Sequence, residues 1–286
     1  MFYKNKNQIW FQEELFSNVK QCFSVSEVIC DTKSNFQDIK IFETKEFGKV
    51  LALDGIVQAS EKDEFIYHES ITHIPLFEHH NPQNVLIVGG GDGGAVREVT
   101  KHASVKLIHL VEIDQAVIDC ASKHLPFLSE NSLKDKRVSI FNKDAFEFIG
   151  KKENFYDIII VDAPDPIGVA KRLFLDSFYK KAYEALKNGG IAIFQSGSFF
   201  LQNSESKKTR SNLLNHFNMV ENIMISLPTY YGGYFLLLMA KKGLNQEKPN
   251  DIKKKIKRSN FKTNCYDEQF HFSVKLENVL TKKFLG

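Results

Sequence analysis

Two carboxylates three residues apart, Asp162 and Asp165, follow directly on an apolar run at 158–161. A buried strand of this kind delivers acids to a ligand, because open parallel sheets bind ligands at the carboxyl ends of their strands. Such a pair suits proton transfer or the binding of a cation. Two alternatives are a turn role for Asp165 ahead of Pro166 and a metal site. The loop offers no nearby histidine or further acid, which disfavours the metal.

A second apolar run, at 85–88, opens into a glycine-rich loop. Gly89, Gly91 and Gly94 satisfy G-x-G-x-x-G, a spacing that by itself is a weak sign of a nucleotide site. Asp92 sharpens the prediction, because a carboxylate there repels a pyrophosphate by up to ~4 kcal/mol at ~4 Å with an effective dielectric near ~20. A nucleoside that carries positive charge is therefore favoured over NAD or ATP. The alternative is that Asp92 only caps the next helix.

Further acids follow the next two expected strands. Glu112 lies 23 residues after Gly89, where a carboxylate in this fold receives the two ribose hydroxyls. Its neighbour Asp114 is interpreted as the cap of the following helix. Asp144 stands just past the third strand, where methyltransferase-like folds often hold an adenine amino group. Together these positions indicate an enzyme for a cationic, nucleoside-like substrate.

The elements that must position these residues fall into two groups. Residues 19–67 read as short strands with turns at Phe47-Gly48 and Asp54-Gly55, and strands are expected at 25–30, 38–44, 50–53 and 56–59. From Glu64 the pattern is helical and then alternates, with strands expected at 85–88, 106–112, 138–142, 157–161 and 190–195 and helices at 94–102, 114–124 and 176–187. Two final strands, 217–226 and 234–241, are close enough for antiparallel pairing.

That order predicts an α/β protein. A Rossmann-like, methyltransferase-type doubly wound sheet is preceded by a small antiparallel β domain. We place the β domain at residues 1–67 and the catalytic domain at 68–286, with a basic extension from about residue 242.

Composition and charge limit the function further. Of the 286 residues, 43% are hydrophobic, enough for a packed core, and the longest apolar stretch, 234–240, is far too short to span a bilayer. We expect a cytoplasmic protein without a membrane partner. The four cysteines lack C-x-x-C spacing, so neither zinc nor a redox pair is indicated. Residues 241–258 hold eight Lys/Arg against two Asp/Glu, and a solvated helix face or linker is favoured there over a nucleic-acid contact.

Seven motifs, taken in chain order, resemble the polyamine aminopropyltransferases. They are Gln37-Asp38, Leu53 to Gln58, Asp63 to Glu69, Gly89 to Gly94, Glu112 to Asp114, Asp162 to Pro166 and Pro228 to Tyr230. The resemblance covers about residues 8 to 241. It implies a β domain on a Rossmann-like domain, assembly as a homodimer or homotetramer, and transfer of aminopropyl from decarboxylated S-adenosylmethionine to putrescine. That donor is a co-substrate, and the resemblance implies no separate cofactor and no metal.

The resemblance also implies roles for single residues. Asp162 matches the family's proton acceptor. The amine-binding groups match Asp165, Tyr67, His68, Tyr230 and Asp92, of which Asp92 corresponds to the acid that binds the aminopropyl ammonium. The positions beside the nucleoside match Gln37, Gly89, Gly91, Glu112, Asp144, Ala145 and Val169. Without the resemblance, His68 reads as an ordinary core or surface histidine.

The sequence departs from the family where Ala145 replaces the usual Gly, Val169 the usual Pro and Lys171 the usual Glu. None of these changes removes an acid that the resemblance assigns to the site. Two rival functions stay open at this point: an amine N-methyltransferase that uses S-adenosylmethionine itself, and a non-catalytic sensor of polyamines or nucleosides. The first requires a neutral or basic contact for the methionine carboxylate near Asp92, and the loop has none.

Overall fold

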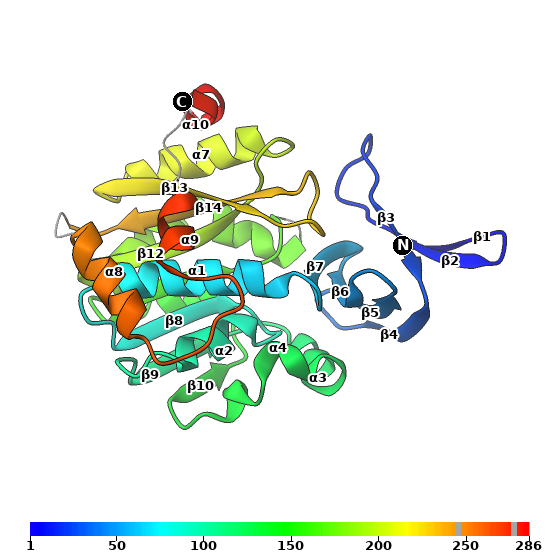
Figure 1. Cartoon of the computed structure of the whole chain (residues 1–286), viewed down its shortest axis with the longest axis horizontal. Coiled ribbons are helices and arrows are strands. Elements are labelled where there is room, and N and C mark those ends of the chain that lie inside the picture. Colours follow the sequence, from blue (N-terminus) through cyan, green and yellow to red (C-terminus); the bar gives the residue numbers. More distant parts are fainter. Residues whose placement is uncertain (167, 244–246, 276–278, 286) are drawn as a thin grey trace.

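The computed structural model (Figure 1) describes residues 1–166, 168–243, 247–275 and 279–285. The side chains of Val169, Val279 and Leu280 are not included in this description. The first part of the chain forms two antiparallel sheets, which Figure 1 shows projecting from the larger α/β part.

The smaller of the two sheets is three-stranded and the other four-stranded. Their strands are β1 (Phe2–Asn5), β2 (Gln8–Gln12) and β3 (Cys22–Val25), then β4 (Glu27–Lys33), β5 (Asp38–Thr44), β6 (Gly48–Leu53) and β7 (Ile56–Ser60). Asp54 and Gly55 both have positive φ, as the two-residue turn between β6 and β7 requires. Phe11, Phe23 and Phe42 pack in the core between the sheets. The division at residue 67 stays a prediction, and α1 begins at Glu64.

One expected strand is wrong. Residues 25–30 do not form a single strand, because the chain leaves one sheet after Val25 and enters the other at Glu27. Ser26 marks this break, and neither glycine nor proline signals it in the sequence. Strands β1 and β2 were not predicted.

The larger part contains a seven-stranded sheet in the order β10-β9-β8-β11-β12-β14-β13. The strands are β8 (Asn84–Gly89), β9 (Leu107–Val111), β10 (Val138–Phe141), β11 (Tyr156–Asp162), β12 (Leu186–Ser198), β13 (Met219–Ser226) and β14 (Tyr234–Lys241). The first five strands in this order pair in parallel, and β14 pairs antiparallel with both β12 and β13. This confirms the predicted methyltransferase-type sheet.

Helices cover both faces of the sheet. They are α1 (Glu64–Glu78), α2 (Gly94–Thr100), α3 (Gln115–His124), α4 (Pro126–Ser129), α5 (Ala145–Ile149), α6 (Asp176–Ala185), α7 (Asn203–Leu214), α8 (Pro249–Arg258), α9 (Glu268–Ser273) and α10 (Val279–Leu285), with 3₁₀ turns η1 (Ser132–Lys134) and η2 (Gly168–Phe174). Side chains alternate along β8, because Val85 and Ile87 join the core beneath α1 and α2, whereas Leu86 and Val88 join the core beneath α5 and α6. A strand buried on both faces reads as a continuous apolar run.

The boundaries of α6 and β12 differ from expectation by several residues. Helix α6 ends at Ala185 rather than at 187, and β12 starts at Leu186 and runs to Ser198. In the basic segment, α8 buries Ile252 and Ile256 and exposes most of its lysines, as expected for a solvated helix face. Among the described residues, none of the helices combines the length and the hydropathy that a membrane span requires.

Candidate active site

The glycine-rich loop and the acidic loop are joined through their main chains. Gly90 N donates a hydrogen bond of 2.8 Å to the carbonyl oxygen of Asp162. Gly89 has φ +76°, and a Cβ there would lie 2.1 Å from the same carbonyl oxygen. Only glycine allows β8 and β11 to end so close together. This contact brings Asp92 and Asp162 to the same edge of the sheet.

Asp162 has one oxygen that the described residues leave unpaired. Its Oδ1 accepts a 2.8 Å hydrogen bond from the Tyr67 hydroxyl, while Oδ2 is buried and has no partner there. Burial and then the charge of Asp92 raise the pKa of Asp162 to about 6. A buried carboxylate with a free oxygen and a pKa near neutrality can accept a proton from a ligand.

Asp92 is held on both sides. Its Oδ1 accepts from Gly94 N, the first residue of α2, at 2.8 Å, and its Oδ2 lies 3.6 Å from His68 Nε2. The N-cap residue of α2 is Gly93 and not Asp92. His68 Nδ1 lies 2.6 Å from Glu64 Oε2. Burial lowers the pKa of His68, but Asp92 and Glu64 outweigh it and raise that pKa well above its usual value. The ring is therefore an imidazolium between two carboxylates.

The structure brings a histidine close to the acidic loop, which the sequence of that loop did not indicate. His68, Asp92 and Asp162 offer atoms within 4.8 Å of one another, so α1 supplies the histidine that the acidic loop lacks. Both ring nitrogens of His68 face carboxylates, however, and an imidazolium has no lone pair for a metal ion. The cluster is better suited to an organic cation.

Two glutamines that sequence reasoning missed support the acidic loop. Gln202 Nε2 donates to Asp165 Oδ1 at 2.7 Å, and Gln195 Nε2 donates to the carbonyl of Ala163 at 3.0 Å. Burial raises the pKa of Asp165. Tyr230 lines the cavity, and its hydroxyl donates to the carbonyl of Gln58, so that proton is not available to a ligand.

The expected nucleoside residues gather at the ends of β9 and β5. Burial is the main reason that the pKa of Glu112 rises to about 7, although its Oε1 accepts from Asp114 N at 2.9 Å. Gln37 Nε2 donates to Asp114 Oδ2 at 3.0 Å, which fixes the amide. Asp114 also accepts from Ala116 N, which confirms it as a helix cap. A Cβ on Gly91 would lie 2.9 Å from Glu112 Cγ, so the loop and this acid are in close contact.

Asp144 caps α5 and is paired with a residue of the neighbouring 3₁₀ turn. Its Oδ1 accepts from Phe146 N at 2.8 Å, and its Oδ2 forms an ion pair with Arg172. Ala145 is buried beside it. The side chain of Val169, also expected near the nucleoside, lies outside the described part of the structure.

One cavity, with an empty volume of about 1270 Å³ including its open mouth, connects these positions. Apart from Val169, every predicted site residue lines it: Gln37, Tyr67, His68, Gly89, Gly91, Asp92, Glu112, Asp144, Ala145, Asp162, Asp165 and Tyr230. Glu13 lines it as well and was missed. Its Oε1 accepts from Val57 N at 2.8 Å, its Oε2 is buried without a partner among the described residues, and burial raises its pKa to about 8.

This fold and this site define a Rossmann-like transferase. Its pocket is acidic at Asp92, where a methyltransferase requires a neutral or basic contact for the methionine carboxylate of its donor. A family model described as the spermine/spermidine synthase domain matches residues 64–250, and one described as the spermidine synthase tetramerisation domain matches residues 9–61. The chain belongs to the spermine/spermidine synthase family, and it is an aminopropyltransferase. The second match supports assembly as an oligomer.

Individual relatives agree with this family. A polyamine aminopropyltransferase of Thermoanaerobacter sp. (strain X514) is 42% identical over 240 residues, which are 84% of this chain and 86% of the relative. One of Methanocaldococcus jannaschii is 40% identical over 271 residues, 94% and 92% of the two chains. A solved spermidine synthase in complex with the transition-state analogue AdoDATO superimposes with a TM-score of 0.91 at 35% identity, covering 97% of this chain and 94% of that one. The spermidine synthase of Thermotoga maritima gives 0.89 at 34% identity, with the same coverage.

Proposed function

We propose that the enzyme transfers the aminopropyl group of decarboxylated S-adenosylmethionine to putrescine, giving spermidine and methylthioadenosine. The unpaired Oδ2 of Asp162, in a cavity whose other acids suit a nucleoside and two ammonium groups, is the observation that carries this proposal. The names of the relatives support it. Assembly as a homodimer or homotetramer and a cytoplasmic location stay predictions.

The chemistry explains why a base is needed. A primary ammonium has a pKa near ~10.4, so roughly one molecule in a few thousand is nucleophilic at pH 7, a deficit of about 4 to 5 kcal/mol. Asp162 accepts the proton that the attacking nitrogen loses. The nitrogen lone pair forms a bond to the methylene carbon, the carbon–sulfur bond breaks, and its electron pair leaves with sulfur as a neutral thioether. Because a sulfonium is already an excellent leaving group, positioning supplies most of the remaining acceleration.

Each end of the donor has a matching subsite. Glu112 and Gln37 suit the ribose hydroxyls, and Asp144 with Ala145 suits the adenine, since all four line the cavity. Asp92 suits the aminopropyl ammonium. A methionine carboxylate placed there would meet this acid, so selectivity against S-adenosylmethionine comes partly from repulsion.

The diamine occupies the remaining acidic end. Asp165 and Glu13 interact electrostatically and suit the ammonium that does not react. Tyr67 and Tyr230 supply aromatic walls, with ring centroids 6.1 Å apart. We propose for His68 a part different from the direct amine contact expected from the sequence. An imidazolium cannot accept a hydrogen bond from an ammonium, so His68 acts through Asp92.

The test is to incubate the purified enzyme with decarboxylated S-adenosylmethionine and a panel of putrescine, cadaverine and spermidine, with S-adenosylmethionine as the control donor. Mass spectrometry follows methylthioadenosine and the amine products. Spermidine formed from putrescine at the highest kcat/KM is the expected result. A preference for another amine overturns the acceptor. Methylated amines formed only with the control donor support the methyltransferase, and no turnover with either donor supports the sensor.

A further inference from the structure

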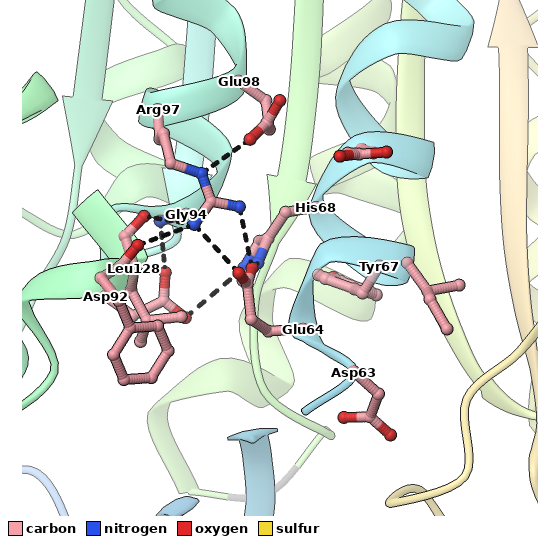
Figure 2. Close-up of polar contacts among 12 residues, drawn as sticks. Asp63, Glu64, Tyr67, His68, Asp92, Gly94, Arg97, Glu98 and Leu128 are labelled. Carbon is pink, nitrogen blue, oxygen red and sulfur yellow. Dashed lines mark hydrogen bonds and ion pairs between the residues drawn. The ribbon is translucent and has the colours of Figure 1, made fainter. Parts of the chain in front are cut away.

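A chain of buried charges leads away from the cavity to Arg97, which lies outside the cavity lining described for this chain. Figure 2 shows the order of contacts, from Asp92 to His68, from His68 to Glu64 and from Glu64 to Arg97. Arg97 continues to Glu98 at 2.6 Å. Arg97, Glu64, His68 and Glu98 are all buried. Buried charges require partners, so each one depends on its neighbour in this chain.

Arg97 is fixed through all three of its nitrogens. Nε donates to Glu98 Oε1, and Nη1 donates to the carbonyls of Phe127 and Leu128 at 3.0 and 2.9 Å. Nη1 and Nη2 also donate to the two oxygens of Glu64, at 3.0 and 2.9 Å. A planar guanidinium that contacts both oxygens fixes the plane of the carboxylate as well as its charge. Glu64 therefore presents Oε2 to His68 in one orientation.

The His68 ring has little room to adjust by itself. A Cβ on Gly94 would lie 2.4 to 2.5 Å from three atoms of the ring, so the ring rests directly on the first residue of α2. With one face closed, the bond from Nδ1 to Glu64 determines where Nε2 points. Nε2 points at Asp92 Oδ2, the oxygen that the bond from Gly94 N leaves free.

We propose that Arg97 is a positioning residue for Asp92. The Arg97 guanidinium compensates the negative charge of Glu64, so the positive charge of His68 stays available to Asp92 and holds the Asp92 carboxylate toward the cavity. The position of that carboxylate in turn sets the affinity for the aminopropyl ammonium. This inference rests on the proposed assignment of that ammonium to Asp92. Without Arg97, Glu64 becomes an uncompensated buried carboxylate that competes for His68, and Asp92 loses its fixed partner.

The experiment compares two ligands that differ at the aminopropyl group. Calorimetry without an acceptor amine gives Kd for decarboxylated S-adenosylmethionine and for methylthioadenosine, which has no ammonium. For Arg97→Met we expect the first Kd to rise about tenfold or more and the second by less than about twofold. Arg97→Lys should recover part of the loss, because an ammonium restores the positive charge beside Glu64 but does not make the planar contact with both carboxylate oxygens that a guanidinium makes. Equal changes in both Kd values, or no change, overturn the inference.

Two further variants keep the test decisive. If Arg97→Met does not fold, Arg97→Lys carries the test and is expected to show the same selectivity with a smaller rise in the donor Kd. The double variant Arg97→Met with Glu64→Gln also removes the carboxylate that competes for His68, so it is expected to recover part of the lost donor affinity; an undiminished selective loss in the double variant overturns the inference. Arg137→Lys is the matched control, because Arg137 also binds an acid and three carbonyls, those of Thr100, His102 and Val105, away from the cavity. It is expected to lower Tm and leave the ratio of the two Kd values unchanged; a selective loss in this control overturns the inference.

Asp92→Asn distinguishes the proposed role of Asp92 from the proposed role of Arg97. If it leaves the ratio of Kd values unchanged, the proposed role of Asp92 fails. If it lowers affinity for the donor selectively while the Arg97 variants do not, the role of Asp92 stands and the positioning role of Arg97 fails.

Discussion

Replacing Asp162 by Asn tests the proposed proton acceptor with little change in shape. The side chain keeps its size and one oxygen, which can still accept the hydrogen bond that the Tyr67 hydroxyl donates at 2.8 Å. The substitution removes the charge and the capacity to accept a proton at Oδ2. The nucleoside residue Glu112 follows another strand, β9, and accepts hydrogen bonds from the main chain of Asp114 and Gly91, so these hydrogen bonds are unaffected.

The size of the effect follows from the proton that must leave. Deprotonating an amine of pKa ~10.4 at pH 7 costs about 4 to 5 kcal/mol, and a positioned general base typically contributes about 10²- to 10⁴-fold. We therefore expect kcat of Asp162→Asn to fall by about 10²- to 10⁴-fold. The Kd of methylthioadenosine should change by less than about threefold.

The pH profile gives a second readout. Burial raises the pKa of Asp162 to about 6, so the free enzyme gains its basic form as the pH rises through that value. The kcat/KM for the amine should rise through about pH 6 in the wild type, and this part of the profile should be absent in Asp162→Asn. Chromatography measures the methylthioadenosine released between pH 5 and pH 9, which gives kcat and kcat/KM at each pH.

A matched control lies on the same strand. Asp157 is a buried acid near the start of β11, where it accepts from Gln83 N and Asn84 N, away from the cavity. Asp157→Asn should lower Tm and leave kcat within about twofold. If Asp162→Asn retains kcat within tenfold of the wild type, the reasoning about the proton acceptor is refuted.

Glu13 gives two further predictions. Glu13→Gln should raise KM for putrescine about tenfold and leave KM for the donor unchanged, because Glu13 lines the cavity and interacts electrostatically with Asp165, which is proposed to bind the diamine. The exposed neighbour Glu14→Gln is the control, and equal KM values in the two variants would contradict the assignment. Burial raises the pKa of Glu13 to about 8, so the folded state binds this proton more tightly than the unfolded state, and stability is lost as the pH rises through that value. Without ligand, Glu13→Gln should therefore gain Tm relative to the wild type between about pH 5 and pH 8, and a constant difference in Tm over that range would show that Glu13 is not buried as described.

Much of the sheet could be predicted because buried strands leave a local signal. The run at 85–88 and the acids after it identified β8 and its loop, and the same reasoning placed Asp162 at the end of β11. A residue that directly follows a strand has its position fixed by that strand. Boundaries without glycine or proline were harder, as the break at Ser26 shows.

The residues that sequence reasoning missed have no such local signal. Glu13 follows a short strand of the N-terminal part and meets Asp165 only through the folding of distant segments. The contact of His68 with Asp92 depends on how α1 packs against α2, and the part of Arg97 depends on both helices. A charged residue on a helix is ordinarily solvated, and only the packing reveals that these are buried.

The main-chain bond between Gly90 and Asp162 also bears on how this enzyme could be redesigned. It sets the separation of the glycine-rich loop and Asp162 through main-chain atoms, so substitutions of side chains other than Gly89 leave that separation unchanged. Ala163, Pro164 and Gln202 line the cavity, follow this bond in the chain and are proposed to shape the acceptor end. Libraries restricted to those positions should therefore yield enzymes for amines of other lengths while the reacting atoms keep their alignment.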